Sequence, residues 1–592
     1  MRRWSYLLPP LLLCGLLGIP SSATGAVTAA PLPPLSGQMP LGAYLPGDPN
    51  ANTHIDPQTI APGVTYTTYT QGYASDRWTV DVHITVDNEA GATLVQDLST
   101  ATDEVNLLAG KNIVAIPVPI GPQPDPTGKP VAYAVRLVTN PGLKSTDPDY
   151  VKFAALADAQ NAVKNILKPN AVDGEPLYTA QDGNPSTGPW NVRVVTIDPT
   201  SPYALRVTHG QDIATPEPLR KQVALSGALL GVNGSDATPG VAVGPPPVPP
   251  NLPKTANGVP VLEGYTGVPE GLDVEGGVTM NAANDHRTAL LLNGANGPAQ
   301  ITEVSTTYTL SSSDKSSTTV NGIDRLAGNV YGCGQPGAII DDSRLNPTQA
   351  AQDPIQAVHH GQCHNPNDLV LFRPEWGSAT PKVVGADPGY EVVLNNNWVV
   401  TGSRVAGGPI APGQRVLQGI GTGADWLRQH APVGATLIAT GSLTDDGGKS
   451  VAAPALDAIA GGGPGLVRGG NIDVSMVKNG FPAHSNVDVE RQPRTVVGIG
   501  AAGQIELVTI DGRNPYPGGS VGVTMGEAAA VMKWLGATDA VEMGYGGDTA
   551  MIINDSLYNT PMNFWGAPVG PGIPNYERAL GNALVLVHKP GP

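Results

Sequence analysis

The chain has 592 residues, more than one hydrophobic core usually supports, so the sequence predicts two or three domains. It contains 74 glycines and 59 prolines but only 14% charged residues, which favours many turns and strands and few long surface helices. The apolar fraction of 40% excludes a disordered chain. The formal net charge is −17, and lysine and arginine form no cluster, so we expect no nucleic acid partner.

Residues 1–26 have the pattern of a secretory signal peptide. Arg2 and Arg3 precede a leucine-rich apolar run, and small residues close the segment. No later apolar run is long enough to cross a bilayer, so we expect no membrane span. The mature protein is therefore predicted to be secreted or associated with the cell envelope.

A linker and a small α+β module are predicted next. Residues 27–62 are rich in proline, alanine and glycine, which is typical of a semi-extended linker. Residues 63–183 alternate strand and helix patterns in the order βαββαβ, which predicts a ferredoxin-like module. The predicted strands cover 78–86, 114–120, 131–137 and 175–179, and the predicted helices cover 99–108 and 157–167.

This module resembles a SPOR-type peptidoglycan-binding domain, whose second half has a strand, an alanine-rich helix and a closing strand. The resemblance implies that residues 63–183 bind peptidoglycan. A small α+β spacer without a ligand fits the same pattern, and the sequence leaves both interpretations open.

The rest of the chain, residues 187–592, is predicted to form a large mixed α/β domain, so that the whole protein is of the α+β class. A strand begins at Trp190, and an apolar strand over 228–232 ends at Asn233. Thr524 and Glu527 have the spacing of a capping box, and a glycine at 536 can end the helix that follows.

Two cysteines remain after the predicted leader. Cys333 and Cys363 would lie in an oxidising compartment, which favours a disulfide stabilising the fold by about 3 to 4 kcal/mol. The alternative is a metal site made with His359, His360 and His364, but neighbouring histidines in a loop point in different directions. We therefore expect the disulfide, no metal and no other cofactor.

Several common catalytic motifs are excluded. The sequence has no Gly-x-Ser-x-Gly and no His-Glu-x-x-His, so neither a serine hydrolase elbow nor a zincin helix is present. A GxGxxG string at 332–337 contains a proline and lacks the flanking strand and helix of a dinucleotide site.

Four short motifs near the C-terminus combine arginine, aspartate and glycine. Arginine can meet two phosphate oxygens at once, and glycine-rich loops present backbone N–H groups to anions. Two of the motifs contain such an arginine, Arg494 and Arg513, although each could instead form a salt bridge on a strand. The motifs are Gln492-Pro493-Arg494-Thr495, Asp511-Gly512-Arg513, Gly544-Tyr545-Gly546-Gly547-Asp548 and Gly581-Asn582-Ala583-Leu584.

These motifs and their spacing resemble the phosphodiester glycosidase family, the bacterial relatives of the enzyme that uncovers mannose 6-phosphate by removing N-acetylglucosamine. The resemblance covers nearly all of residues 187–592, including the two cysteines. It implies a hydrolase that cleaves a sugar-1-phosphate diester in a carbohydrate or phosphoglycan substrate. Where the family usually reads Leu-Asp-Gly-Gly-Gly-Ser, this chain reads Met543 to Asp548, so the family's aspartate falls on Gly544.

Cleaving the bond between C1 and oxygen builds positive charge on the sugar ring, so the reaction needs a carboxylate near the ring and cations on the leaving phosphate. Glu542 and Asp236 are further acids that could replace the missing aspartate. The alternative function is an inactive homologue that binds cell-wall glycan, which Gly544 and Ser235 favour. The resemblance implies catalytic roles for Asp511 and Asn233, and substrate binding by Arg494, Arg513, Gly544, Gly546, Gly547 and Asn582. Asp548 lies beside a matched motif, and we expect it to be catalytic as a replacement for the missing aspartate.

Overall fold

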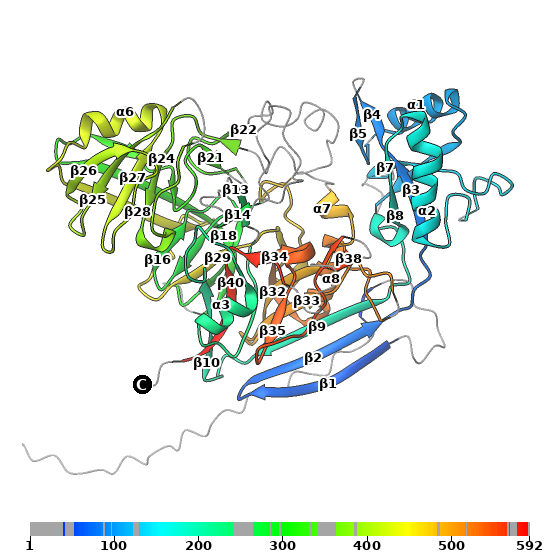
Figure 1. Ribbon diagram of the computed structural model, residues 1–592. Coiled ribbons are helices and arrows are strands. Elements are labelled where there is room, and N and C mark those ends of the chain that lie inside the picture. The colour runs from blue at the N-terminus through cyan, green and yellow to red at the C-terminus, as the bar shows by residue number, and fades with distance from the viewer. Residues whose placement is uncertain are drawn as a thin grey trace, which may run out of the picture. The chain divides into compact units, whose positions relative to one another are not determined.

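The computed structural model shows a protein built mainly of β-strands (Figure 1). Strands hold 42% of the described residues and helices 16%, so the expected α+β class with a large mixed α/β domain is wrong. The short apolar runs between glycines and prolines were expected to belong to an α/β domain. They are instead strands of several sheets in which nearly all described pairs are antiparallel. The structure describes residues 39–41, 52–86, 89–95, 97–121, 130–147, 149–235, 237–240, 264–284, 286–294, 298–330, 333–340, 363–383, 387–481, 486–516, 518–564, 567–568 and 577–589.

One long sheet runs in the strand order β1-β2-β9-β33-β32-β34-β30-β31. Its paired strands are antiparallel, and β9 lies between β2 and β33. Val192, Val194 and Val195 of β9 are buried, as expected for a central strand covered on both faces. The strands are β1 (Asn52–Ala61), β2 (Val64–Gln71), β9 (Trp190–Ile197), β33 (Ile505–Ile510), β32 (Arg494–Gly500), β34 (Ala537–Tyr545), β30 (Gly465–Arg468) and β31 (Asn471–Ile472).

A second sheet packs on this one and closes the core. Its order is β10-β40-β12-β35-β36, and residues of both sheets form one buried apolar cluster. Val232 and Leu584 come from the second sheet and Val497 and Met543 from the first. The two sheets therefore form a sandwich whose strand ends can meet at one edge. The strands are β10 (Tyr203–Thr208), β40 (Ala583–His588), β12 (Leu230–Asn233), β35 (Met551–Ile553) and β36 (Ser556–Leu557).

Helix α8 (Met525–Leu535) contacts β30, β32 and β34 of the first sheet. Its N-cap Thr524 accepts from the backbone N–H of Glu527, whose carboxylate accepts from the backbone N–H of Thr524. Gly536 ends the helix with φ of +98°. The predicted capping box and C-cap are confirmed.

Two further large sheets belong to this part of the chain. One runs β16-β15-β29-β17-β18-β19, with β28 also paired to β18, and the other runs β20-β24-β27-β25-β26. The first carries β15, which contributes to the candidate site. Their strands are β15 (Asp273–Glu275), β16 (Val278–Asn281), β17 (Thr288–Leu292), β18 (Gln300–Ser312), β19 (Ser317–Thr319), β20 (Gly322–Ile323), β24 (Leu369–Phe372), β25 (Tyr390–Leu394), β26 (Val400–Val405), β27 (Arg415–Gly419), β28 (Leu437–Asp445) and β29 (Asp457–Ala460). The remaining helices of this part include α3 (Leu219–Leu225), α6 (Gly421–His430) and α7 (Asn486–Val489).

The segment between β2 and β9 contains a small sheet in the order β6-β7-β3-β8. Arg136 of β7 is buried and bonds both Asp81, at 2.9 Å, and Asp182, at 2.6 Å. The elements are β3 (Trp78–Val82), β4 (Ile84–Val86), β5 (Glu89–Ala92), α1 (Leu98–Gly110), β6 (Ala115–Ile120), β7 (Ala132–Leu137), α2 (Leu156–Ala162) and β8 (Gly174–Tyr178).

The predicted boundaries at 62 and 63 do not coincide with a change of sheet. Residues 52–61 of the expected linker form β1, and β2, at the start of the expected module, pairs with β9 of the long sheet. Gln71 and Trp190 are register partners, so the chain leaves the long sheet and returns to it at the same place. Figure 1 shows β1, β2 and β9 side by side.

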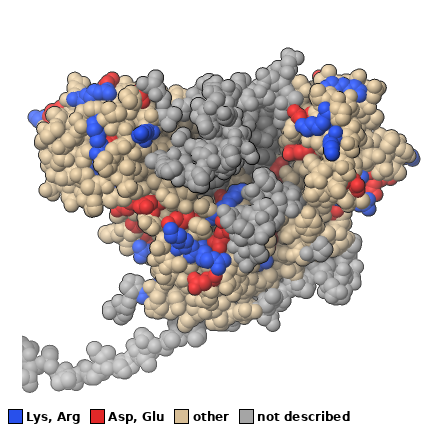
Figure 2. Space-filling view, viewed as in Figure 1, with Lys and Arg blue, Asp and Glu red and all other residues tan. Residues whose placement is uncertain are grey.

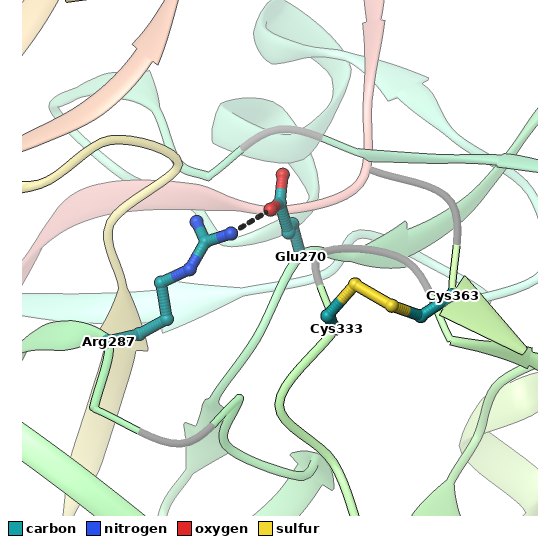
Figure 3. Close-up of a disulfide and its surroundings, with 4 residues drawn as sticks. All are labelled: Glu270, Arg287, Cys333 and Cys363. Carbon is teal, nitrogen blue, oxygen red and sulfur yellow. Dashed lines mark hydrogen bonds and ion pairs between the residues drawn. A yellow bond between two sulfur atoms is a disulfide. The ribbon is translucent and has the colours of Figure 1, made fainter. Parts of the chain in front are cut away.

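Cys333 and Cys363 form the predicted disulfide, with 5.2 Å between their Cα atoms (Figure 3). Cys363 begins β23 (Cys363–His364), which pairs with β21 (Asn329–Val330) and β22 (Ile339–Ile340). The alternative metal site is excluded for this pair, since both sulfurs are used in the disulfide. His359 and His360 lie outside the described residues. No helix in the described segments is long and apolar enough to cross a membrane.

Candidate substrate site

Strand ends from both sheets of the sandwich meet at one edge. β12 ends at Asn233, which is in register with Ala583 at the start of β40. In the facing sheet, Arg494 at the start of β32 is in register with Tyr545 at the end of β34. Residues far apart in the sequence are therefore brought together at this edge.

Asn233 connects the two sheets. Its Oδ1 accepts from Thr495 Oγ1 at 2.5 Å and from the backbone N–H of Ala550 at 3.1 Å, and its side chain is fully buried. A Cβ atom placed on Gly544 would lie 2.7 Å from Asn233 Nδ2 and 3.9 Å from Asp548 Cβ. The amide of Asn233 thus occupies the space that a side chain at 544 would need, which explains why glycine stands there.

Two arginines lie against the glycine loop that continues from β34 into the 3-10 helix η6 (Gly546–Asp548). A Cβ atom on Gly546 would lie 3.1 Å from Nη1 of Arg513, and one on Gly547 would lie 2.7 Å from Cζ of Arg578. Arg578 also forms an ion pair with Asp548 at 3.1 Å. Glycine at both loop positions therefore lets the two guanidinium groups approach the backbone closely.

The backbone of Arg513 is in the left-handed region, with φ of +56°. Such a conformation is unusual for a residue with a side chain and recurs at functional sites. Its Nη2 donates to the side-chain oxygen of Gln492. Burial lowers the pKa of Arg513 to about 10, with Glu490 and Tyr545 acting against it and Arg578 and Arg494 adding to it. Arg513 therefore remains charged at neutral pH beside two other cations.

Glu490 holds the side chain of Gln492 in place through a hydrogen bond. Its Oε2 accepts from Gln492 Nε2 at 3.0 Å and from Gln181 Nε2 at 3.2 Å. Burial raises the pKa of Glu490 to about 8, although the hydrogen bond from Gln181 and the charge of Arg513 lower it. At neutral pH this carboxyl is mostly protonated, which limits its neutralising effect on Arg513.

Arg494 has a different environment from the one expected of a phosphate ligand. Its side chain is fully buried, and its Nη1 forms an ion pair with Glu542 at 2.5 Å. Its Nε donates to the carbonyl of Val523 at 2.7 Å, and its Nη2 donates to the carbonyl of Glu490 at 3.2 Å. Glu542, considered as a replacement acid, is the buried partner of this arginine. Arg494 thus joins β32 to β34 and the segment before α8.

The two candidate aspartates are both paired with arginines. Asp511 follows β33 and bonds Arg193 Nη1 at 2.5 Å, and its Oδ1 accepts from the backbone N–H of Thr560 at 3.2 Å. The Cβ of Asp548 would lie 3.9 Å from a Cβ built on Gly544, and its carboxylate pairs with Arg578 at 3.1 Å. Asp236 lies outside the described residues.

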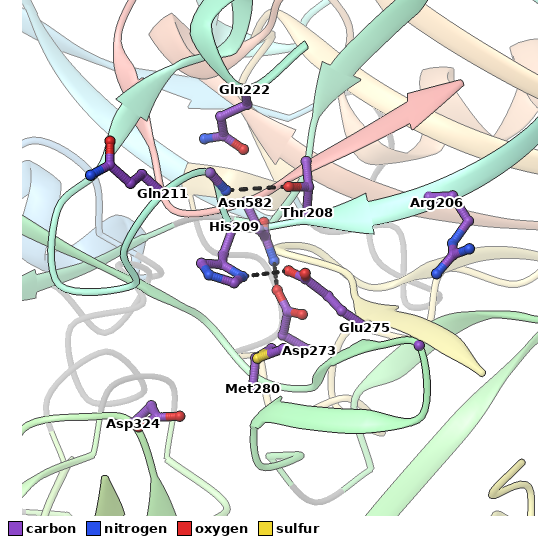
Figure 4. Close-up of polar contacts among 12 residues, drawn as sticks. Arg206, Thr208, His209, Gln211, Gln222, Asp273, Glu275, Met280, Asp324 and Asn582 are labelled. Atoms are coloured by element: carbon purple, nitrogen blue, oxygen red, sulfur yellow. Dashed lines mark hydrogen bonds and ion pairs between the residues drawn. The ribbon is translucent and has the colours of Figure 1, made fainter. Parts of the chain in front are cut away.

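Asn582, fully buried, bridges the sandwich to β15. Its Nδ2 donates to Asp273 Oδ2 at 2.7 Å, and its Oδ1 accepts from Ser235 Oγ at 3.3 Å. Figure 4 shows Asn582 and Asp273 facing each other, with Glu275 and His209 alongside. His209 Nδ1 lies 2.7 Å from Glu275 Oε1. The side chain of Asn582 is therefore held between Ser235, which follows Gly234, and Asp273.

Arg578, Glu490 and Asp273 were not among the residues predicted from the sequence. Arg578 stands four positions before Asn582, a spacing that carries no recognisable signal alone. Asp273 belongs to a short strand more than three hundred residues from Asn582 in sequence. Figure 2 shows positive and negative side chains side by side on the described part of the face in view.

Comparisons with known proteins agree with the motifs. Residues 388–587 match the family model of the phosphodiester glycosidases. No curated protein matches the chain. The crystal structure of the "Putative exported protein" of Burkholderia pseudomallei K96243 has 28% sequence identity and a TM-score of 0.72, and the match covers 93% of this chain and 98% of that one.

Two other solved structures match with lower scores. A hypothetical protein from Synechocystis has 14% identity and a TM-score of 0.46 over 90% of this chain and 80% of its own. The zebrafish N-acetylglucosamine-1-phosphodiester alpha-N-acetylglucosaminidase catalytic domain, auto-inhibited by its pro-peptide, has 11% identity and a TM-score of 0.28 over 86% and 87%. The family match itself contains Arg513, the glycine loop, Arg578 and Asn582. The segment that matches the phosphodiester glycosidase model thus carries most of the candidate site residues.

Proposed function

We propose that the protein hydrolyses a sugar-1-phosphate diester of an envelope or extracellular glycan. The observation that carries the proposal is the approach of Arg513 and Arg578 to the glycine loop, at 3.1 and 2.7 Å from the built Cβ positions. Two guanidinium groups beside the glycine loop suit a phosphate, because each fork can bond two oxygens and glycine leaves backbone N–H groups unshielded by a side chain. The family match over residues 388–587 supports a hydrolase acting on phosphodiester-linked sugars.

In this proposal the residues have separate roles. Arg513 and Arg578 hold the phosphate, and Gln492 fixes the fork of Arg513 through its hydrogen bond. Asp548 supplies the carboxylate that the family places at 544, since its Cβ lies 3.9 Å from that position. Arg494, contrary to the expected role, organises the site from within the buried core.

The reaction breaks the bond from C1 to the bridging oxygen, which leaves with the phosphate as a phosphomonoester. Water supplies the new oxygen on C1, and Asp548 stabilises the positive charge on the ring and takes up the proton of that water. Asn233 and Asn582 fix the walls of the site through buried hydrogen bonds. Asp511, paired with Arg193, holds the turn that carries Arg513.

The test is release of free sugar from sugar phosphodiesters and from isolated envelope glycans by the full chain. Asp548→Asn should lower kcat by at least about a hundredfold, because a general base and charge stabiliser is lost. Asp314→Asn, which alters an exposed acid paired with His430, is the matched control. Turnover in Asp548→Asn equal to that of the unmodified protein would reject the assigned role.

A second candidate function is glycan binding without catalysis. The observation favouring it is that Asn233 fills the space beside Gly544, where the family carries its aspartate. Sugar phosphate binding measured by calorimetry, with no sugar released from any substrate over a day, would establish this alternative.

We also propose that the protein is exported. We propose in addition that residues 63–183, the predicted SPOR-like module, bind peptidoglycan. The leader pattern of residues 1–26 and the disulfide support export. Peptidoglycan sedimentation of the full chain, compared with a chain in which 72–189 is replaced by a short turn, tests the second part. Equal sedimentation of both proteins would assign that segment to a spacer role.

A further inference from the structure

We propose that Asp273 is a positioning residue, one that fixes the side-chain amide of Asn582 in the candidate site and makes ligand binding depend on pH. The inference rests on the proposed function, since it concerns the same site. It concerns an acid on β15, a strand that precedes the segment matched by the family model.

The hydrogen bonds define which way the amide of Asn582 points. Its NH2 group donates to Asp273 Oδ2 at 2.7 Å, and its oxygen accepts from Ser235 Oγ at 3.3 Å. A flipped amide would place its oxygen against the acceptor Oδ2 of Asp273, whereas the Ser235 hydroxyl can donate or accept and fits either orientation. Asp273 therefore selects the orientation in which Asn582 presents its oxygen toward Ser235 and Gly234.

Asn582 is connected to the glycine loop through one residue. A Cβ atom on Gly234 would collide with Asn582 Oδ1, and the carbonyl oxygen of Gly234 lies 3.1 Å from a Cβ built on Gly544. The amide orientation is thus transmitted to the place where the family's aspartate is missing. A change at Asp273 reaches the site through Asn582 without any direct contact with the loop.

Asp273 is fully buried, and its Oδ1 has no hydrogen-bond partner among the described residues. A buried carboxyl oxygen without a partner favours the protonated form, since the ionised form would lose its solvation. The groups around it are Glu275 on the same strand, His209 after β10, and Asp457 on β29, which is paired with Arg206. Figure 4 shows His209 and Glu275 next to Asp273.

The pKa of Asp273 is raised to about 8, mainly by burial and also by the charges of Glu275 and Asp457, against the lowering effects of Asn582 and His209. At neutral pH the group is mostly neutral. Above pH 8 it becomes a buried anion close to a site proposed to take an anionic phosphate. The repulsion should weaken both ligand binding and turnover as the pH rises.

Two variants of Asp273 distinguish its hydrogen bond to Asn582 from the effect of its charge on the site. Asp273→Asn keeps a hydrogen-bond acceptor for Asn582 and cannot ionise, whereas Asp273→Ala removes the acceptor. Glu506→Gln is the matched control, because Glu506 is also a buried carboxyl with a pKa raised by burial to about 8 but lies at the far end of β33. Since Glu490 titrates in the same range, kinetics are measured in a Glu490→Gln background.

We expect kcat/KM of the Glu490→Gln protein to fall about tenfold between pH 7 and pH 9. Adding Asp273→Asn should remove that fall and change the value at pH 7 by no more than about twofold. Adding Asp273→Ala should lower kcat/KM at least about tenfold at every pH. Adding Glu506→Gln should leave the pH dependence of kcat/KM unchanged. A fall that persists in Asp273→Asn, or an unaffected Asp273→Ala, would overturn the inference.

A second measurement needs no substrate. In protein labelled with 15N-asparagine, the side-chain NH2 signal of Asn582, assigned by its loss in Asn582→Asp, should shift with a midpoint near pH 8 and stop shifting in Asp273→Asn. A signal that stays constant from pH 6 to 9 rejects the inference even if the protein is an active hydrolase. A shifting signal in a protein that releases no sugar rejects the proposed hydrolysis and leaves Asp273 as the residue that orients Asn582.

Discussion

The guanidinium of Arg494 and the carboxylate of Glu542 lie 2.5 Å apart with both side chains fully removed from solvent. Removing one partner of such a pair leaves a buried charge uncompensated. Arg494→Met should therefore lower the free energy of unfolding by about 3 to 5 kcal/mol, measured by urea denaturation. Glu542→Leu added to Arg494→Met should recover much of that loss. A stable Arg494→Met protein that no longer binds sugar phosphates would instead identify Arg494 as a ligand arginine.

Arg513 and Arg578 are expected to act on the ligand rather than on the fold. Arg513→Ala and Arg578→Ala should each lose about 1.5 to 3 kcal/mol of binding, which corresponds to a roughly tenfold to hundredfold weaker affinity for glucose 1-phosphate. Calorimetry measures the affinity directly. Arg428→Ala changes an exposed arginine paired with Asp425 and should leave the affinity unchanged. Undiminished affinity in both site variants would remove the phosphate from the proposed site.

Restoring the family's residue at 544 is expected to fail. Gly544→Asp places its Cβ 2.7 Å from Asn233 Nδ2, and Asn233 is held by Thr495 and Ala550. We expect Gly544→Asp to lower both the melting temperature and turnover. Gly402→Asp is the matched control, because nothing lies within 4 Å of a Cβ at that position of β26. Higher turnover in Gly544→Asp would show that Asn233 can move aside.

The disulfide closes a segment with a sequence separation of 30. For a loop of that length the chain-entropy model gives a stabilisation of about 3.5 kcal/mol. Protein that begins at residue 27 should show no reactive thiol until it is reduced and unfolded. Cys333→Ser with Cys363→Ser should then lower the free energy of unfolding by a comparable amount. Two thiols titrated in the native, unreduced protein would contradict the bond.

Glu506 should make the protein less stable as the pH rises. Burial raises its folded-state pKa to about 8, so the folded protein holds the proton more tightly than the unfolded chain. This contribution is fully present below the unfolded pKa, near 4.5, and is lost as the pH rises to about 8. Glu506→Gln should therefore be more stable than the unmodified protein at pH 9, by about 2 to 4 kcal/mol. Melting curves at pH 5 and 9 test this, and an identical pH dependence in both proteins would contradict it.

Local features of the sequence predicted parts of the structure well. The capping box at Thr524 and Glu527 depends on residues three apart, and the glycine at 536 follows from local backbone geometry. The disulfide followed from the number of cysteines and the expected compartment. In each case the deciding interaction lies within a short segment or involves few possible partners.

The class of the fold could not be obtained in the same way. Pairing between strands depends on residues far apart, such as Gln71 with Trp190 or Asn233 with Ala583. Periodicity in a short apolar run does not identify its partner or the number of sheets. The mostly β architecture therefore appeared only with the structure.

The candidate site also combines features that depend on neighbouring residues with contacts between residues far apart in the sequence. The motifs made the glycine loop, Arg513 and Arg494 candidates for the ligand, and these roles stay predictions. The structure shows in addition that Arg494 is fully buried. Whether an arginine meets a phosphate or a buried glutamate depends on Glu542, on the neighbouring strand. Asp273 had no motif at all, because its importance follows from one hydrogen bond to Asn582.

The register pairing of Gln71 with Trp190 makes residues 72–189 an insertion between two paired strands of the long sheet rather than a segment that precedes this sheet. A fragment that begins at 187 would lose β1 and β2, and β9 would become an open edge strand able to pair with other molecules. Such a fragment should aggregate although it contains the whole family match. Joining Gln71 to Trp190 through a two-residue turn would instead convert β2 and β9 into a hairpin and keep that edge covered.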